Sequence, residues 1–589
     1  MKAKKVLGLL LSVAMVTGLM TGCGNDDSGN SSNGGGDVQS SGQTNNGGNS
    51  GGDESNSGEA NGGEANGGGE VVDTKPFYLT LDPEVSGSID VMCWSGDSVY
   101  YSDLGHMSIA DEDLTSKNVA MIYAMAKKFN EMYPNLKINL YAKTDDPDSN
   151  DTSWDQELEN FKAEHGKYPD IYASTMLPDD TAKGMVADLS VFADDPLYQS
   201  FNSSLMAQMN YYGFQAGLPQ FMQPWGVFVN KELAEDNNID VPGPDWTIED
   251  YTDFVTSADN TNFWGLVYGS ATQFIQTGTD TVVKAMNEGT EVNMASDQVM
   301  SLLDYIPQWS EYEIFTKNGQ GAVDSAIMDD GWWWSYRFFC RNYCLTSAGD
   351  PWMMTDSAMG QNEDGTWPTN AVESGDWDIY PRPATDYRGN TVGIVIDPMA
   401  IHNYAMDDGD PAWSDAEKAQ LDLAYAFGSY WCGATEAMQA RADQQWNNAG
   451  VMQSCLNDSF PLVTGDDFDA QMKIWYSTVN HARYGDAEKM PGFQYVVQLW
   501  EEGQIWDVSD KCYPWYVYED GTRKECIYEW LNLTNEEVVG VPVTSASWLD
   551  TVKANLPEWN KKMNDRLTEA QNSLKEGLKT YYGFTDADF

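Results

Sequence analysis

Three tryptophans, Trp332, Trp333 and Trp334, follow one another within the segment 329–339. Neither a helix nor a strand points three consecutive side chains in one direction, so we expect one indole to face away from the core. A rigid indole covers the apolar face of a flat ring at little entropic cost, and neighbouring carboxylates and amides bond to the hydroxyls on its rim. That chemistry is recognition of a neutral, hydroxyl-bearing solute. The alternative is that all three rings cover the start of a helix in the core.

The other candidate binding residues lie at the ends of predicted strands or on them. They are Trp94 and Asp97 after the first strand, Asp145 after the second, Ser174 and Thr175 after the third, and Trp225 and Asp397 on two later strands. In open α/β sheets, ligands bind at the carboxyl ends of the strands. We therefore expect these side chains to gather along one edge of the sheet, with a turn cap as the alternative role for Asp397.

The elements that must position these residues alternate between strand and helix. Strands are predicted at 88–96, 136–143 and 168–175, and helices at 117–133 and 154–166. The first helix carries apolar residues at helical spacing, and Pro134 ends it. This order predicts a parallel sheet whose strands are joined by helical crossovers.

One acidic segment has the spacing of a calcium-binding loop. Asp146, Asp148, Asn150 and Glu157 occupy positions 1, 3, 5 and 12 of an EF-hand-like pattern. Asp151 stands at position 6, where the loop must turn sharply and Gly is usual. In so acidic a chain this spacing arises by chance, and the favoured interpretation is an Asp/Ser-rich helix start. We predict no metal site and no cofactor.

The N-terminal segment is predicted to be processed and not folded. A basic start and an apolar run lead to 19-LMTGC-23, which resembles the lipobox of bacterial lipoproteins, with Met20 where Leu is usual. The resemblance implies a signal peptide over 1–22, cleavage after Gly22 and a diacylglyceryl thioether, with acyl chains such as palmitate, on Cys23. Residues 23–76 are rich in Gly, Ser and Asn and read as a tether with a reach of about 40 Å. We expect a protein anchored on the extracytoplasmic face of the cell membrane, in a Gram-positive bacterium.

The charge of the chain limits its partners. A formal net charge of −58, from 33 basic and 91 acidic residues, argues against nucleic acid as a partner. Cys512 and Cys526 flank a predicted hairpin that turns at 520–521, so a cross-strand disulfide is one alternative, and buried thiols are the other.

Several segments together resemble the extracellular solute-binding proteins of family 1, the maltose-binding-like components of carbohydrate ABC importers. The similarity spans 77–450, and its segments are 126–140, 166–176, 218–255, 325–335, 376–384 and 391–403. Within 218–255, Thr247 and Asp250 fit a capping box. Residues 451–530 do not follow the family pattern and are either a lid over the cleft or extra packing.

The resemblance implies an α/β, two-lobed periplasmic-binding-protein fold with a hinge and a ligand cleft between the lobes, plus an aromatic-rich C-terminal extension. The folded part covers 77–589. Lobe one is expected over 77–218 and 393–440, and lobe two over 219–392 and 441–589. In this pattern the Trp after the strand-ending Gly is a sugar platform, which points to Trp332, with Trp333 or Trp334 packed against the lobe.

The expected function is capture of a neutral oligosaccharide by a monomeric, lipid-anchored receptor that delivers it to the ABC permease and performs no chemistry. One alternative is the same fold binding a peptide or another polar solute. Another is a cell-surface glycoside hydrolase, but among 91 acidic residues some carboxylate pair with suitable spacing always exists. A surface adhesin is disfavoured because the chain has no repeats.

Overall fold

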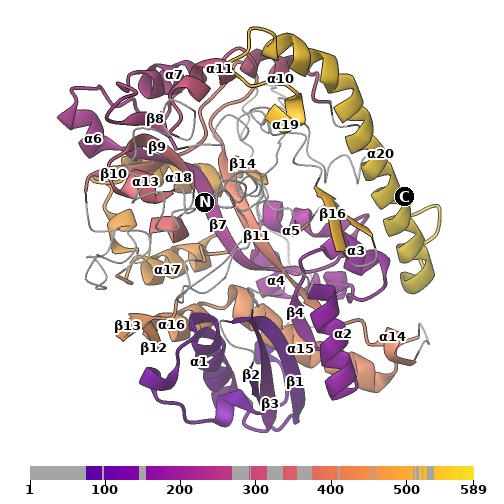
Figure 1. Cartoon of the computed structure of the whole chain (residues 1–589). Coiled ribbons are helices and arrows are strands. Elements are labelled where there is room, and N and C mark those ends of the chain that lie inside the picture. The colour runs from indigo at the N-terminus through magenta and orange to yellow at the C-terminus, as the bar shows by residue number, and fades with distance from the viewer. Residues whose placement is uncertain are drawn as a thin grey trace, which may run out of the picture.

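The computed structural model of the chain describes residues 75–95, 99–144, 154–267, 291, 293–314, 336–349, 351–354, 375–408, 412–448, 450–456, 459–479, 481–507, 511–512, 516–519, 522–526 and 536–589. Figure 1 shows two α/β lobes, one below and one above, with two long strands passing between them. This arrangement confirms the predicted fold class.

The first lobe is built on a mainly parallel sheet. β1 (Gly87–Ser95) lies between β3 (Leu136–Thr144) and β4 (Ile171–Ala173) and runs parallel to both, as the strand–helix order predicts. At the outer edge β2 (Val99–Tyr101) pairs with β3 in the antiparallel sense, which the sequence pattern does not predict. The carboxyl ends of β1, β3 and β4 therefore meet at one edge of the sheet.

Two antiparallel strands join the lobes. β11 (Val392–Ile401) pairs with β4 of the first lobe and along its length with β7 (Leu218–Asn230). β7 continues into the second lobe, where it pairs with β9 (Cys344–Gly349) and β10 (Trp377–Tyr380). β8 (Trp264–Leu266) lies parallel to β9. One sheet thus passes through both lobes, and β7 and β11 are its only described crossing strands.

The helices begin and end where local chemistry requires. α1 (Lys117–Met132) starts after Ser116, whose side chain accepts a hydrogen bond from the Val119 N–H. The remaining elements between 77 and 218 and between 405 and 454 are η1 (Phe77–Leu79), η2 (Leu104–His106), η3 (Asp111–Asp113), α2 (Trp154–His165), α3 (Leu177–Ala182), η4 (Leu189–Phe192), α4 (Pro196–Ser200), α5 (Ser203–Gln208), β5 (Asn210–Tyr211), β6 (Phe214–Gln215), α14 (Ala405–Asp408), α15 (Asp415–Gly433), α16 (Thr435–Asp443), β12 (Gln445–Asn448) and β13 (Val451–Ser454).

In the second lobe α7 (Ile248–Thr256) starts with the predicted capping box, in which Thr247 and Asp250 each bond to the other's backbone N–H. The other helices of this lobe are α6 (Lys231–Asp236), α10 (Asp297–Leu302), α11 (Ile306–Glu311), α13 (Tyr336–Cys340) and η5 (Pro351–Met354). None of the described helices combines the length and apolarity that a membrane-spanning segment needs.

The C-terminal extension packs against the sheet that joins the lobes. Its elements are α17 (Asp466–Trp475), η7 (Ala482–Gly485), α18 (Pro491–Glu501), β14 (Ile505–Asp507), β15 (Tyr516–Glu519), β16 (Thr522–Cys526) and α19 (Glu536–Val539). β14 adds to β11 as a parallel neighbour. Trp475, Phe493 and Trp500 are buried in one core with β7 and β11 side chains, so the described part of α17 and α18 serves packing.

β15 and β16 pair as the predicted hairpin, with Glu519 opposite Thr522. Cys512 is buried, but the Cys526 side chain lies outside the described residues, so the disulfide stays a prediction.

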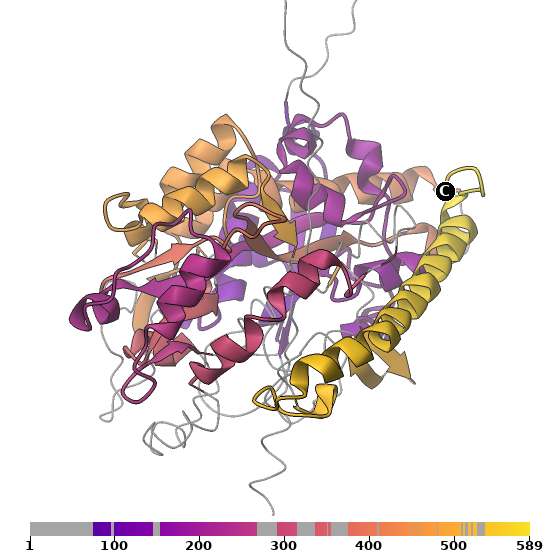
Figure 2. The ribbon, with the colours of Figure 1, turned by 90° about the horizontal axis from the view of Figure 1, so that it is seen from above.

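The last helix, α20 (Trp548–Tyr582), reaches both lobes. Its Asn560 side chain accepts a hydrogen bond from the Met294 N–H in the second lobe, at 2.7 Å. Near its other end, the Tyr582 hydroxyl donates to the Val186 carbonyl in the first lobe, also at 2.7 Å. Figure 2 shows the helix lying along one flank of the molecule. The expected assignment of 441–589 to lobe two stays a prediction.

Candidate functional site

Two of the predicted residues meet at the carboxyl end of β4. The backbone N–H of Ser174 donates to the carbonyl of Pro398 at 3.0 Å, which places Asp397 beside the end of this strand. The Ser174 hydroxyl donates to the Asp180 carboxylate at 2.6 Å and accepts from the Met176 N–H at 3.2 Å. The Ser174 hydroxyl is therefore largely engaged in hydrogen bonds around the start of α3. The adjacent Thr175 is half-buried.

The backbone of Trp94 lies at the same edge of the sheet. β1 and β4 are in parallel register with Met92 opposite Tyr172, so Trp94 at the end of β1 is level with Ser174. This confirms that the strands deliver both positions to one edge. The Trp94 side chain lies outside the described residues, so its contact with a ligand stays a prediction.

Asp397 lies on β11 at a break in the pairing with β7, where the register shifts between Asp397 and Pro398. This residue is 2 % exposed, and its carboxylate forms an ion pair with the ammonium of Lys511, a residue that is 7 % exposed. Both charges can be buried because each supplies the other's partner.

β7 presents polar side chains on the same sheet face as Asp397. Phe221 stands opposite Asp397, Gln223 opposite Val395 and Trp225 opposite Gly393, and cross-strand partners share a face. Gln223 is therefore a diagonal neighbour of Asp397, about 7 Å away along the sheet. The opposite face of β7 carries Met222, and Trp225 belongs to the same buried hydrophobic core as Met222.

Gln223 is the most unusual side chain of this face. It is fully buried, yet neither its Nε2 nor its Oε1 has a hydrogen-bond partner. Among the amide side chains that the structure describes, no other leaves both its donor and its acceptor unpartnered in a buried position. A buried amide without partners costs about 1–3 kcal/mol, so this position favours a ligand that supplies both a donor and an acceptor.

Trp225, two positions further along β7, is 4 % exposed, and its indole N–H also has no partner. The same is true of Trp264, Trp431 and Trp446, so an unpartnered indole alone does not mark a site. Trp225 contributes to the candidate site through its place beside Gln223, and its role as a stacking platform stays a prediction.

Several predicted residues lie outside the described residues. They are Asp97, Asp145, Trp332, Trp333 and Trp334, the lipidation candidate Cys23, and the calcium candidates Asp146, Asp148 and Asn150. The fourth calcium candidate, Glu157, is on α2 and accepts a hydrogen bond from the Tyr141 hydroxyl at 3.5 Å. Over the part of the chain that the structure describes, no group of three or more His, Cys, Asp or Glu side chains is placed to hold a metal ion.

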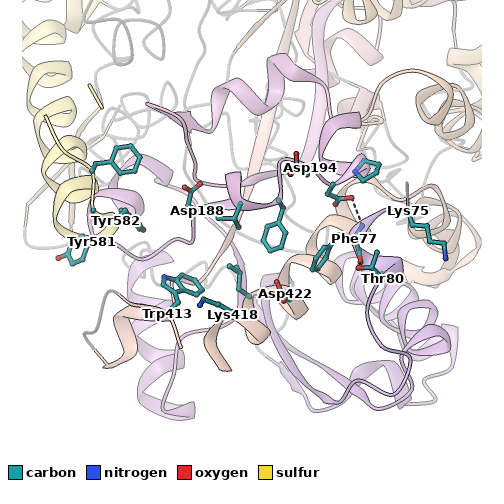
Figure 3. A pocket seen from close by; sticks show the side chains of 17 residues that line it. Lys75, Phe77, Thr80, Asp188, Asp194, Trp413, Lys418, Asp422, Tyr581 and Tyr582 are labelled. Carbon is teal, nitrogen blue, oxygen red and sulfur yellow. Dashed lines mark hydrogen bonds between the residues drawn. The ribbon is translucent and has the colours of Figure 1, made fainter. Parts of the chain in front are cut away.

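A hollow of about 870 Å³ lies elsewhere on the first lobe, between η1, η4, the start of α15 and the end of α20 (Figure 3). None of the candidate residues lines it. Its carboxylate Asp195 accepts from the backbone N–H groups of Phe77 and Leu197 and from the Tyr425 hydroxyl. Asp188 accepts from the Ser190 and Gln215 N–H groups. These groups hold the fold together, and we do not place the site there.

Sequence reasoning missed Gln223 and Lys511. Gln223 lies in the segment 218–255 that carries the resemblance, and the strand period that places Trp225 on one face also places Gln223 there. This alternation of side chains along the strand could have identified Gln223 from the sequence. No such pattern identifies Lys511, because Lys511 lies in the extension, 114 positions from Asp397.

Comparisons with known proteins bear on the fold. No family model and no curated protein matches the sequence. The sugar-binding protein MalE from Xanthomonas citri is similar in structure, with a TM-score of 0.52 at 11% identity over 83% of this chain and 100% of that one.

An ABC transporter solute-binding protein from Thermotoga lettingae, bound with α-D-tagatose, gives a TM-score of 0.48 at 12% identity over 82% of this chain and 100% of that one. An ABC substrate-binding protein from Listeria monocytogenes, in complex with cycloalternan, gives a TM-score of 0.43 at 14% identity over 85% of this chain and 100% of that one. The similarity to MalE confirms the two-lobed fold that the sequence motifs predict.

Proposed function

We propose that this protein is the substrate-binding component of an ABC importer and that it captures a neutral oligosaccharide between its lobes. The observation that carries the proposal is Gln223, a buried amide with an unpartnered donor and acceptor on a strand that joins the lobes. A sugar hydroxyl both donates and accepts, so it satisfies the two halves of such an amide. A site built this way discriminates strongly, because a ligand without the hydroxyl leaves the amide unmet.

The fold supports the same class of ligand. The structurally similar MalE from Xanthomonas citri is a sugar-binding protein. Two crossing strands, β7 and β11, allow hinge closure around a solute, which excludes water from the hydrogen bonds inside. In this proposal one of Trp332 and Trp333 supplies the stacking surface, and the permease recognises the closed form.

The test is calorimetric titration of the full chain with neutral oligosaccharides of varied linkage, with tryptophan fluorescence followed in parallel. We expect a Kd of about 1 μM or tighter for at least one sugar. Trp332→Ala is expected to remove the fluorescence change and weaken binding, because the indole is the stacking partner of the sugar ring. Trp413→Ala, in the hollow of the first lobe, is the control and is expected to leave both unchanged.

Three outcomes would redirect the proposal. Heat with peptides and none with any sugar would keep the fold and replace the ligand class. Chromatography of the added oligosaccharide after incubation separates a receptor, which returns it intact, from a glycoside hydrolase. Unchanged fluorescence and affinity in Trp332→Ala would move the stacking role to another indole.

The proposal includes a location. A lipid on Cys23 and the tether of 23–76 would hold the folded part near the permease while leaving it free to reach solute. Growth with labelled palmitate tests this: we expect label on the wild-type chain and none on Cys23→Ser.

A further inference from the structure

Lys511 brings the C-terminal extension to the edge where the candidate residues meet. Its ammonium pairs with Asp397 on β11, and its carbonyl accepts the Leu177 N–H at the start of α3, at 2.9 Å. The next carbonyl, that of Cys512, accepts from the Tyr211 hydroxyl at 3.0 Å. Residues 511–512 are therefore fixed to β11, to α3 and to β5.

The two charged side chains of this ion pair are both buried. Asp397 is 2 % exposed and Lys511 is 7 % exposed, so water screens neither. A buried carboxylate without a counter-charge attracts any cation that reaches it, because the local dielectric is low. Paired with an ammonium, the same carboxylate still accepts hydrogen bonds but no longer offers a net charge.

Asp180 is the second carboxylate here. It is 2 % exposed and accepts from the Ser174 hydroxyl at 2.6 Å. Asp180 is the same in chains that differ only at Lys511, so the comparison of such chains tests the lysine and not this carboxyl group.

We propose that Lys511 is a specificity-determining residue of the binding site: its ammonium cancels the charge of Asp397, so that this edge accepts neutral hydroxyl-bearing ligands and rejects ligands that carry an ammonium group. The inference rests on the proposed function and deepens it. It also assigns a role to the extension, which supplies the charge from a segment that does not follow the family pattern.

The first experiment needs no ligand. Lys511→Met removes the charge while keeping much of the stem, and leaves Asp397 buried without a partner. We expect a lower urea midpoint for Lys511→Met, and a restored midpoint for the double variant Lys511→Met/Asp397→Asn, in which neither charge remains. Lys489→Met is the control, because the Lys489–Asp486 pair in the same extension is exposed and contributes little. If the double variant is no more stable than Lys511→Met, the proposal that Lys511 neutralises the charge of Asp397 is wrong.

The second experiment measures specificity with matched probes. Cello-oligosaccharides and the glucosamine oligomers of the same linkage differ in that a hydroxyl of each ring is replaced by an ammonium group, and maltose and glucose are compared with their amino-sugar counterparts in the same way. We expect wild type to prefer the neutral member of a pair, and Lys511→Met to shift that ratio by about tenfold or more towards the ammonium-bearing member. Lys511→Arg is expected to keep the wild-type ratio.

The outcomes distinguish the proposed function of the protein from the proposed specificity role of Lys511. Binding of neutral sugars with a ratio unchanged in Lys511→Met supports the receptor and overturns the specificity role. No binding of any probe by any chain overturns the proposed function and the specificity role with it, whereas the urea midpoints still decide whether the pair stabilises the fold.

Discussion

Two buried glutamines, eight positions apart, have opposite surroundings. Gln215 on β6 is 2 % exposed, and its side chain donates to the carbonyls of Met206 and Gly217 at 3.1 and 2.9 Å and accepts from Asn210 at 3.1 Å. Gln223 on β7 is equally buried and has no partner for either end of its amide. The first glutamine holds a turn together, and the second is available to something that the chain itself does not supply.

The difference separates structural polar groups from binding ones. A buried amide that is fully bonded contributes about 1 kcal/mol per bond to the fold, whereas an unbonded one costs free energy in the unliganded protein. Such a group calls for a partner from outside the chain, an ordered water or a ligand, and Gln223 lies on the strand face that also carries Asp397.

The largest expected effect concerns a third buried polar group, Asp378 on β10. Its carboxylate accepts from the Gly492 and Phe493 N–H groups at 2.8 and 3.1 Å, which docks the start of α18. Burial raises the pKa of Asp378 to about 6, although these hydrogen bonds oppose the shift. It thus resembles Gln215 in having partners, but it also carries a charge.

Because the pKa is higher in the folded than in the unfolded chain, the folded state binds more protons between pH 4 and 6. The stabilising contribution is therefore present below the unfolded pKa and is lost as pH rises through the folded pKa, a change of about 3 kcal/mol. Urea unfolding across this range should show wild type losing stability relative to Asp378→Asn as pH rises. Parallel curves would show that the carboxyl group has its ordinary pKa.

The second prediction tests the two glutamines directly. Gln215→Leu should lower the free energy of unfolding by about 1–3 kcal/mol, because two carbonyls and an amide lose their partner. Gln223→Leu should instead raise it by about 1–3 kcal/mol, because the substitution removes an amide that is buried without a partner and loses no hydrogen bond. Sugar affinity should respond in the reverse order, falling about tenfold or more only in Gln223→Leu.

Unfolding in urea and calorimetric titration of both variants measure the pair of effects. Equal destabilisation by the two substitutions would mean that Gln223 has a structural partner in solution, and the contrast between the glutamines would disappear.

The smallest effect compares two tryptophans. The Trp246 indole donates to the Pro381 carbonyl at 2.9 Å, whereas the Trp225 indole has no partner. Replacement of either by Phe removes the same atoms, so the cost of Trp246→Phe should exceed that of Trp225→Phe by about 1 kcal/mol, the worth of one hydrogen bond. Thermal unfolding measures the difference, and a larger loss in Trp225→Phe would assign that indole to packing.

Much of the fold could be predicted because its signals are local. Helical spacing and Pro134 predict 117–133, and α1 covers Lys117–Met132. Thr247 and Asp250 predict the capping box that starts α7. The third strand was predicted over 168–175, but β4 pairs only over Ile171–Ala173, because strand length is set by the neighbours that pair with it.

The candidate site could be predicted only in outline. Ser174 and Asp397 are expected at one edge, and the Ser174 N–H bonds to the carbonyl of Pro398, the neighbour of Asp397; their role in binding stays a prediction. The ion pair of Asp397 could not be anticipated, because Lys511 comes from a segment outside the family pattern.

The sequence by itself determined the order of strands and helices, their caps and the acidic, tethered character of the chain, since each depends on neighbours a few residues away. Only the tertiary structure decided which of two chemically identical glutamines has partners and which lysine neutralises Asp397. The physical reason is that hydrogen bonds and ion pairs of buried side chains depend on distance in space, and the groups that make them here lie up to 114 positions apart.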